Sequence, residues 1–202
     1  MKYCNMVILA ISVFLLPFGC KTDGETKKQK EVHESGSADR YQQGSVLSFH
    51  EAALTGQAGD VLKYLEAGID VNVRDSDGRT ALMYASYNGH VEVMRNLLLK
   101  GADVNLQDNY GRTALMMASS GPFPQAVRLL LDNYADPNIA DKEEHFTALM
   151  YAAAEGQTEI VKILLSRNAN PSLKDKDGDM ALTFALNNGH DEVVKILKPV
   201  TK

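Results

Sequence analysis

The chain has 202 residues, of which 45% are hydrophobic, and its formal net charge is -5. This apolar fraction is enough to build a core and too high for a disordered chain, while the acidic excess argues against a nucleic-acid partner, whose phosphates require clustered Lys and Arg. Two cysteines and five scattered histidines form no cluster in the sequence, and no phosphate-binding loop, nucleophile elbow or H-E-x-x-H pair occurs. We therefore expect no cofactor, no bound metal and no catalytic site.

The first twenty residues are predicted to be a secretion signal. Lys2 precedes an apolar run that is too short to cross a bilayer as a helix. The run ends in LPFGC, and Gly19-Cys20 in this context resembles the lipobox of bacterial lipoproteins. The resemblance implies that residues 1–19 are removed as a signal peptide and that a lipid is attached to Cys20. An ordinary cleaved signal and a retained anchor are the alternatives.

Residues 20–45 are expected to form a disordered polar tether behind the lipidated cysteine. Five basic and five acidic side chains balance there, and few residues are apolar. Such a segment cannot bury enough surface to offset its ordering entropy. By resemblance to bacterial lipoproteins, Lys21 in place of an Asp after the cysteine favours the outer membrane of the cell envelope.

A repeated motif fills the rest of the chain. Residues 78–105 read GRTALMYASYNGHVEVMRNLLLKGADVN, and residues 111–138 read GRTALMMASSGPFPQAVRLLLDNYADPN. The threonine of the motif recurs at Thr80, Thr113 and Thr147, with spacings of 33 and 34 residues. A period of this length indicates stacked units of one supersecondary structure.

The period and the T-x-L-x-x-A core resemble the ankyrin repeat. The resemblance implies an all-α solenoid, in which helix–turn–helix units stack and are joined by β-hairpin-like turns. It covers a domain over residues 46–202, with units at about 46–74, 75–107, 108–140, 141–174 and 175–200. The family is one of protein-binding modules, so the resemblance also implies a non-enzymatic function.

Local chemistry agrees with the repeat. Each motif threonine stands where a first helix begins, and its hydroxyl can accept from an otherwise unpaired amide. Gly89 is expected to end a first helix and Gly101 a second one. Tyr134 occupies the slot of Gly101 in the third unit, where a β-carbon in the left-handed conformation costs about 1 kcal/mol. Leu47 and Met180 replace the threonine in the outer units, which we expect to be caps.

The resemblance places partner binding on the concave face formed by the hairpin tips and the first helices. Mapped by position, the candidate partner-binding residues are Arg74, Asp77, Arg79, Tyr87, Asn88, Asn109, Tyr110, Arg112, Ser120, His145, Phe146 and Glu155. The expected anchors are the aromatic and arginine members, because these residue types are enriched in binding hot spots. Arg79 and Arg112 are expected to lie side by side and to make a basic patch, which favours a partner with an acidic loop.

The sequence therefore predicts a monomeric protein–protein interaction module that is exported and lipid-tethered in the bacterial envelope. Two alternatives stay open. One is an inhibitor or immunity-type protein that blocks a specific envelope enzyme, and the other is a purely structural lipoprotein.

Overall fold

The computed structural model describes the backbone of residues 35–201 and the side chains of residues 44–201. The predicted signal peptide, Cys20 and the first part of the expected tether lie outside the described residues. Between residues 35 and 201 the chain forms ten helices and no extended strand. Their bounds are α1 Ser35–Leu54, α2 Ala58–Glu66, α3 Ala81–Tyr87, α4 Val91–Leu99, α5 Ala114–Ser120, α6 Pro124–Asp132, α7 Ala148–Ala154, α8 Thr158–Ser166, α9 Ala181–Asn187 and α10 Asp191–Leu197.

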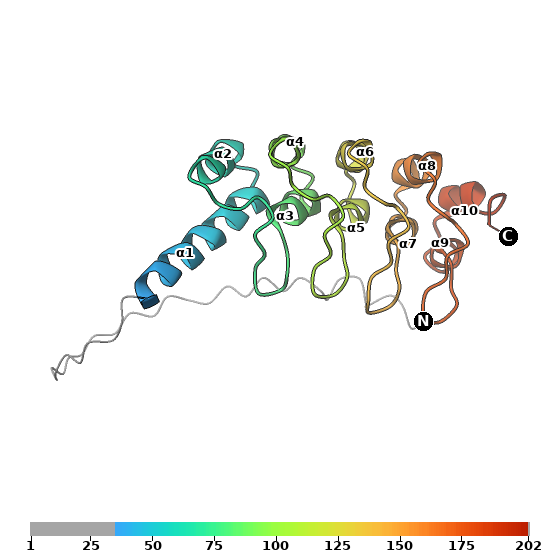
Figure 1. The fold of residues 1–202 in the computed structure, drawn as a ribbon. Helices are drawn as coiled ribbons and strands as arrows, with labels where there is room; N and C mark the ends of the chain where they lie inside the picture. Colours follow the sequence, from blue (N-terminus) through green and yellow to red (C-terminus); the bar gives the residue numbers. More distant parts are fainter. Residues whose placement is uncertain (1–34, 202) are drawn as a thin grey trace, which may run out of the picture. The chain divides into compact units, whose positions relative to one another are not determined.

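Consecutive helices form pairs, and the pairs stack within the compact unit of residues 40–202. The odd-numbered helices make one row and the even-numbered helices a second row, while long loops reach away from both rows toward one side (Figure 1). Each loop joins the second helix of one pair to the first helix of the next and turns back on itself as a hairpin. The predicted all-α solenoid is therefore confirmed.

The inner first helices begin as the sequence indicates. Thr80, Thr113 and Thr147 are N-caps with extended backbone, and each hydroxyl accepts from the amide three residues later. In α3 the Met83 sulfur lies 3.5 Å from the Thr80 amide, which closes the reciprocal pair. In α9 the order is reversed, because Met180 cannot cap and the Thr183 hydroxyl accepts from the Met180 amide instead.

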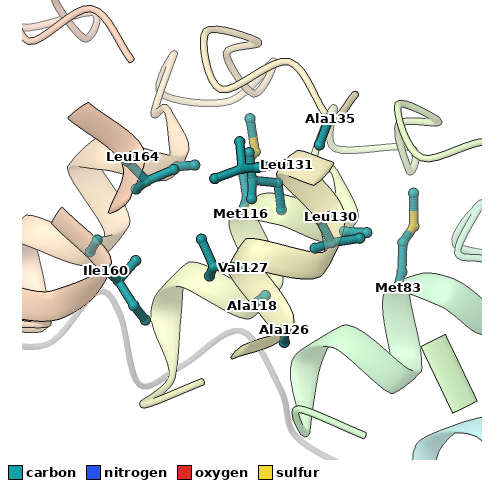
Figure 2. Packing of buried hydrophobic residues seen from close by; sticks show 14 of the residues in the cluster. Met83, Met116, Ala118, Ala126, Val127, Leu130, Leu131, Ala135, Ile160 and Leu164 are labelled. Carbon is teal, nitrogen blue, oxygen red and sulfur yellow. The ribbon is translucent and has the colours of Figure 1, made fainter. Parts of the chain in front are cut away.

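Residue size explains why the two rows differ. The first helices are rich in alanine, and buried alanines such as Ala85 and Ala118 let neighbouring backbones approach closely. The second helices contain few alanines and pack mainly through Val, Leu and Ile side chains, as Figure 2 shows around α6, where Val127 and Leu130 lie among side chains of the neighbouring helices. Close first helices and wider second helices make the hairpin side the inner side of the stack.

The first helix departs from expectation. α1 begins at Ser35, so residues 35–45 are helical, although they were expected to belong to the disordered tether. The physical reason lies at Leu47, which has no hydroxyl to cap a new helix and continues the helical conformation. Burial of Phe49 and Ala53 anchors the helix. Each further residue added toward the N-terminus then gains one hydrogen bond for the one residue that becomes ordered.

The third pair carries two irregularities. Pro122 stands where Gly89 adopts a φ of +67°, and a proline ring cannot reach that conformation. The chain instead turns through an extended Gly121 and starts α6 with Pro124. Tyr134 has a φ of +66°, as expected from its place in a glycine slot, and its side chain is 88% exposed.

Two histidines join neighbouring pairs. The Nε2 atom of His90 lies 2.9 Å from the Leu54 carbonyl oxygen, and His190 makes the same contact with Ala154. Both histidines therefore bind the backbone of the preceding repeat and act as structural residues.

His50 is a buried histidine in the first pair. Its Nε2 atom lies 3.1 Å from the Val73 carbonyl oxygen, so the neutral ring carries its hydrogen on that nitrogen. Burial lowers the pKa of His50 below its usual value, although the Val73 hydrogen bond and Asp75 act in the opposite direction. The ring is therefore kept neutral as part of the core.

Two buried hydroxyls generate a stability prediction. Ser86 and Ser119 are fully buried, and their Oγ atoms find no hydrogen-bond partner among the described residues. Alanine fills the same slot at Ala53 and Ala153. We expect Ser86→Ala and Ser119→Ala each to raise the free energy of unfolding by about 1 kcal/mol, because a buried unpaired hydroxyl is removed.

Urea unfolding followed by circular dichroism measures this effect. Ser120→Ala is the matched control, because its hydroxyl bonds the Met117 carbonyl and is partly exposed, so little change is expected there. A loss of stability in both buried variants would show that the two hydroxyls have partners after all.

Candidate functional site

The candidate site is the row of hairpins together with the ends of the first helices. Adjacent hairpins are joined by backbone hydrogen bonds that repeat along the row. The Asn109 amide donates to the Asp77 carbonyl at 2.9 Å, and the Lys142 amide donates to the Tyr110 carbonyl at 2.8 Å. The amide of Lys176 donates to Glu144 in the same way at 3.0 Å. The tips therefore form one continuous ledge.

An aspartate opens each hairpin and holds its shape. The four residues are Asp75, Asp108, Asp141 and Asp175. Each hairpin takes the number of the unit that it opens, so these aspartates belong to the second, third, fourth and fifth hairpins. In the second hairpin the Asp75 Oδ1 atom accepts from the amides of Asp77 and Arg79 at 2.9 and 2.8 Å. Asp108 and Asp175 make the equivalent pair of bonds in their own hairpins. The carboxylate thus replaces water for the amides of a tight turn.

The second carboxylate oxygen bonds the adjoining first helix in two of the hairpins. The Tyr84 hydroxyl donates to Asp75 at 2.6 Å, and the Tyr151 hydroxyl donates to Asp141 at 3.1 Å. Burial and the neighbouring carboxylate raise the pKa of both tyrosines. Both hydroxyls therefore stay protonated and act as donors that tie hairpin to helix.

In the third unit, arginine takes this place. Met117 occupies the tyrosine slot, and the Asp108 Oδ2 atom accepts instead from the Arg112 Nε and Nη2 atoms at 2.9 and 2.8 Å. Arg79 of the preceding hairpin approaches the same oxygen at 4.0 Å. The Asp108 side chain is 0% exposed, so this is a buried carboxylate between two cations.

This pairing corrects the expected basic patch. Arg79 and Arg112 do lie together, but the acid that bridges them is the chain's own Asp108, and Arg79 also pairs with Asp77 at 3.4 Å. Their charges are largely used within the protein. The Arg112 guanidinium also stacks over the Tyr110 ring at 4.8 Å. An acidic partner loop is therefore not required between these two arginines.

Several other predicted residues hold the repeats together. Arg74 donates to the Gly78 and Gln107 carbonyls, Asn88 to Leu54 and Asn109 to Ser76. The Ser120 hydroxyl donates within its own helix. Phe146 packs edge-on against Phe184, with ring centroids 4.9 Å apart, so it belongs to the core more than to the surface.

The predicted residues that offer side chains outward are fewer. Tyr110, His145 and Glu155 are exposed, and Tyr87 is half-buried near the end of α3. Because their hairpins and helices are fixed by the bonds described above, they form a preorganised face. Among the described residues there is no group of three or more His, Cys, Asp or Glu that could hold a metal ion.

Sequence reasoning missed the opening aspartates, although an Asp at the same place in four successive hairpins was a visible signal. It also left Gln107, Lys142 and Lys174 out of the binding set. These three residues surround an open depression at the fourth hairpin. The signal for it was the extra residue in that hairpin.

The shared carboxylate generates a prediction. Asp108→Ala removes the counter-charge of two partly buried arginines and the hydrogen-bond acceptor of two turn amides. We therefore expect a loss of about 3 kcal/mol in the free energy of unfolding. Asp175→Ala removes the same two turn bonds without an arginine, and we expect about 1 kcal/mol. Urea unfolding measures both, and equal losses would show that the arginines gain nothing from Asp108.

Residues 49–141 and 124–201 match the family model described as ankyrin repeats (3 copies). Within residues 35–201 there is no helix with both the length and the apolar character needed to cross a bilayer.

The similar curated proteins come from plants. The chain is 52% identical over 50 residues to "Probable E3 ubiquitin-protein ligase XBOS33" of Oryza sativa subsp. japonica, which is 25% of this chain and 10% of that protein. It is 42% identical over 53 residues to acyl-CoA-binding domain-containing protein 2 of Arabidopsis thaliana, or 26% and 15%. A longer match, 32% identical over 95 residues, is to "Probable E3 ubiquitin-protein ligase XBOS32" of Oryza sativa subsp. japonica, or 41% and 19%. The chain thus spans about a tenth to a fifth of these relatives.

The family match extends over most of the chain and coincides with the stacked helix pairs and their hairpins. On that evidence the chain belongs to the ankyrin-repeat family.

Proposed function

We propose that this protein is a non-enzymatic binding module, built of five ankyrin units, whose hairpin and first-helix face docks one protein partner. The observation that carries the proposal is the ledge of hairpins, in which each turn is pinned by a buried or half-buried aspartate and bonded to its neighbour. A face fixed in this way loses little entropy when a partner binds. Tyr87 and Tyr110 are its aromatic contacts, since tyrosine supplies large contact area with few rotatable bonds.

We further propose that the module is exported and held in the bacterial envelope by a lipid on Cys20. The support is the sequence of the first twenty residues, with a short apolar run that ends in Gly19-Cys20. A lone cysteine left after cleavage has no partner for a disulfide, and acylation would remove a reactive thiol from an oxidising compartment. The outer membrane is favoured because Lys21 follows the cysteine.

The anchor is tested by changing one residue. We expect Cys20→Ala to move the protein from the membrane fraction to the soluble fraction, because the acyl chains provide the membrane affinity. Fractionation of cells that express the full chain, together with the mass of the purified protein, measures this. A wild-type mass without acyl chains would contradict the anchor, as would a Cys20→Ala protein that stays on the membrane.

The binding face is tested by photo-crosslinking in the same cells. A photoreactive amino acid at position 87 or 110 is expected to capture one protein, whereas the same group at Lys162, on the exposed side of α8, is expected to capture none. Tyr87→Ala with Tyr110→Ala should then weaken binding of the purified partner by about a hundredfold, with helicity unchanged. Tyr134→Ala is the control, because Tyr134 is also an exposed tyrosine but lies after a second helix.

The outcomes separate the rival functions. A captured envelope enzyme that loses activity on binding would favour the inhibitor or immunity-type alternative. No capture from either inner position would favour a structural lipoprotein and would contradict the proposed binding face. Equal capture from position 162 would place the partner on the second helices instead.

A further inference from the structure

An open depression of about 500 Å³ lies beside the fourth hairpin, and the regular repeat does not contain it. It lies between the third and fourth hairpins and is bounded on its other side by the start of the fifth hairpin. The lining residues that carry the argument are Gln107, Ala140, Asp141, Lys142, His145 and Lys174.

The depression exists because one spacer side chain is missing. Arg74 reaches across to the Gln107 carbonyl, and Gln107 in turn reaches the Ala140 carbonyl at 3.4 Å. Each also bonds its own hairpin, Arg74 at the Gly78 carbonyl and Gln107 at the Gly111 carbonyl. Ala140 occupies the same slot one unit later, and its methyl group cannot reach the Lys174 carbonyl. The space that Arg74 and Gln107 fill in the earlier units is left open.

The loop beside the depression is also changed. The third hairpin closes with the Asp108 amide on the Arg112 carbonyl, whereas the fourth closes one residue later, with the Asp141 amide on the Phe146 carbonyl. The longer loop places His145 at a φ of +62°.

The other three hairpins have glycine at this position, namely Gly78, Gly111 and Gly178, each at a positive φ. A side chain there costs about 1 kcal/mol, and such strain is concentrated at functional sites. An absent spacer, an added residue and a strained histidine thus coincide at one place.

Two lysines and one histidine line the depression, and none of the three has an ion-pair partner among residues 44–201. Lys142, His145 and Lys174 are exposed. The stem of Lys142 is held against Gly111, where a β-carbon would lie 2.7 Å from the Lys142 Cγ atom. Lys142 is therefore positioned by the preceding hairpin.

The acidic groups nearby form no ion pair with these residues, although the Asp141 carboxylate also lines the depression. Asp141 is buried, and its oxygens accept from the Glu144 amide at 2.9 Å and the Tyr151 hydroxyl at 3.1 Å. Glu143 and Glu144 belong to the same loop but do not line the depression. The depression therefore offers two ammonium groups and an imidazole to a ligand that brings its own negative charge.

We propose that this depression binds a carboxylate side chain from an acidic segment of the protein partner. The inference rests on the proposed function and moves the acidic contact from the internally paired Arg79 and Arg112 to the fourth hairpin. Ala140 leaves the room, and Lys142 and Lys174 supply the charge. His145 adds a ring donor or acceptor at the rim.

The test is a titration of the isotope-labelled full chain with an acetylated, amidated tetraglutamate peptide, followed by backbone amide NMR shifts. Saturable shifts are expected for residues 140–147 and 173–174. Inorganic phosphate is titrated separately as a second anion. It is expected to cause smaller shifts, which do not reach saturation over the concentration range in which the peptide shifts do.

Two variants remove the site in different ways. Ala140→Gln restores the spacer that Gln107 provides and is expected to fill the depression without loss of thermal stability. Lys142→Glu with Lys174→Glu removes the charge, and we expect at least about a tenfold weaker peptide affinity in each case. The matched control is Lys100→Glu with Lys162→Glu, which makes the same change in net charge at exposed lysines outside the depression.

Shifts confined to these residues, lost in both variants and kept in the control, would support the proposal. Absence of saturable shifts, an equal loss in the control, or phosphate binding as tight as the peptide would each overturn it. If Ala140→Gln fails to fold, the lysine pair still decides. Crosslinking from position 110 is read separately, so partner capture that persists without peptide binding would refute the subsite and leave the binding face standing.

Discussion

The structure depends on one interaction that recurs in every hairpin, an aspartate carboxylate that accepts amides of its own turn. In three hairpins one oxygen takes two amides, and in the fourth it takes one. The second carboxylate oxygen of Asp75 and of Asp141 accepts from a tyrosine of the adjoining first helix, and that of Asp108 accepts from an arginine. Without these bonds each hairpin would expose unpaired backbone groups and could take many conformations. With them, the tips align closely enough to bond one another.

That alignment connects folding to function. Stacked repeats contact only their neighbours, so a long surface must be made rigid unit by unit. The histidines on preceding carbonyls, the amide ladder of the tips and the Arg74 and Gln107 spacers all act between adjacent units. Residues that resemble free binding contacts are mostly used in this way. The contacts left for a partner are the few side chains that the repeat does not need.

The fourth hairpin shows how specificity can arise on such a scaffold. Its backbone keeps the ladder, with Lys142 bonded to Tyr110 and Lys176 to Glu144, although it is one residue longer. Because both ladder contacts are preserved, the extra residue changes the surface and not the stacking. Ala140 and His145 then alter the shape and the charge at a position where the neighbouring units are regular.

The sequence by itself determined the period, the helix starts and the family, because these follow from local features: threonine caps, glycine stops and apolar spacing that recur every 33 or 34 residues. It could also place Tyr134 in a left-handed slot, since that slot is set by its own helix end. Only the tertiary structure decided which exposed residues are available. Arg79 and Asp108 lie in different units, and their contact depends on how the units stack. The start of α1 at Ser35 and the space beside Ala140 were decided there too, because a helix extends from a buried anchor and a depression is defined by what three successive units leave unfilled.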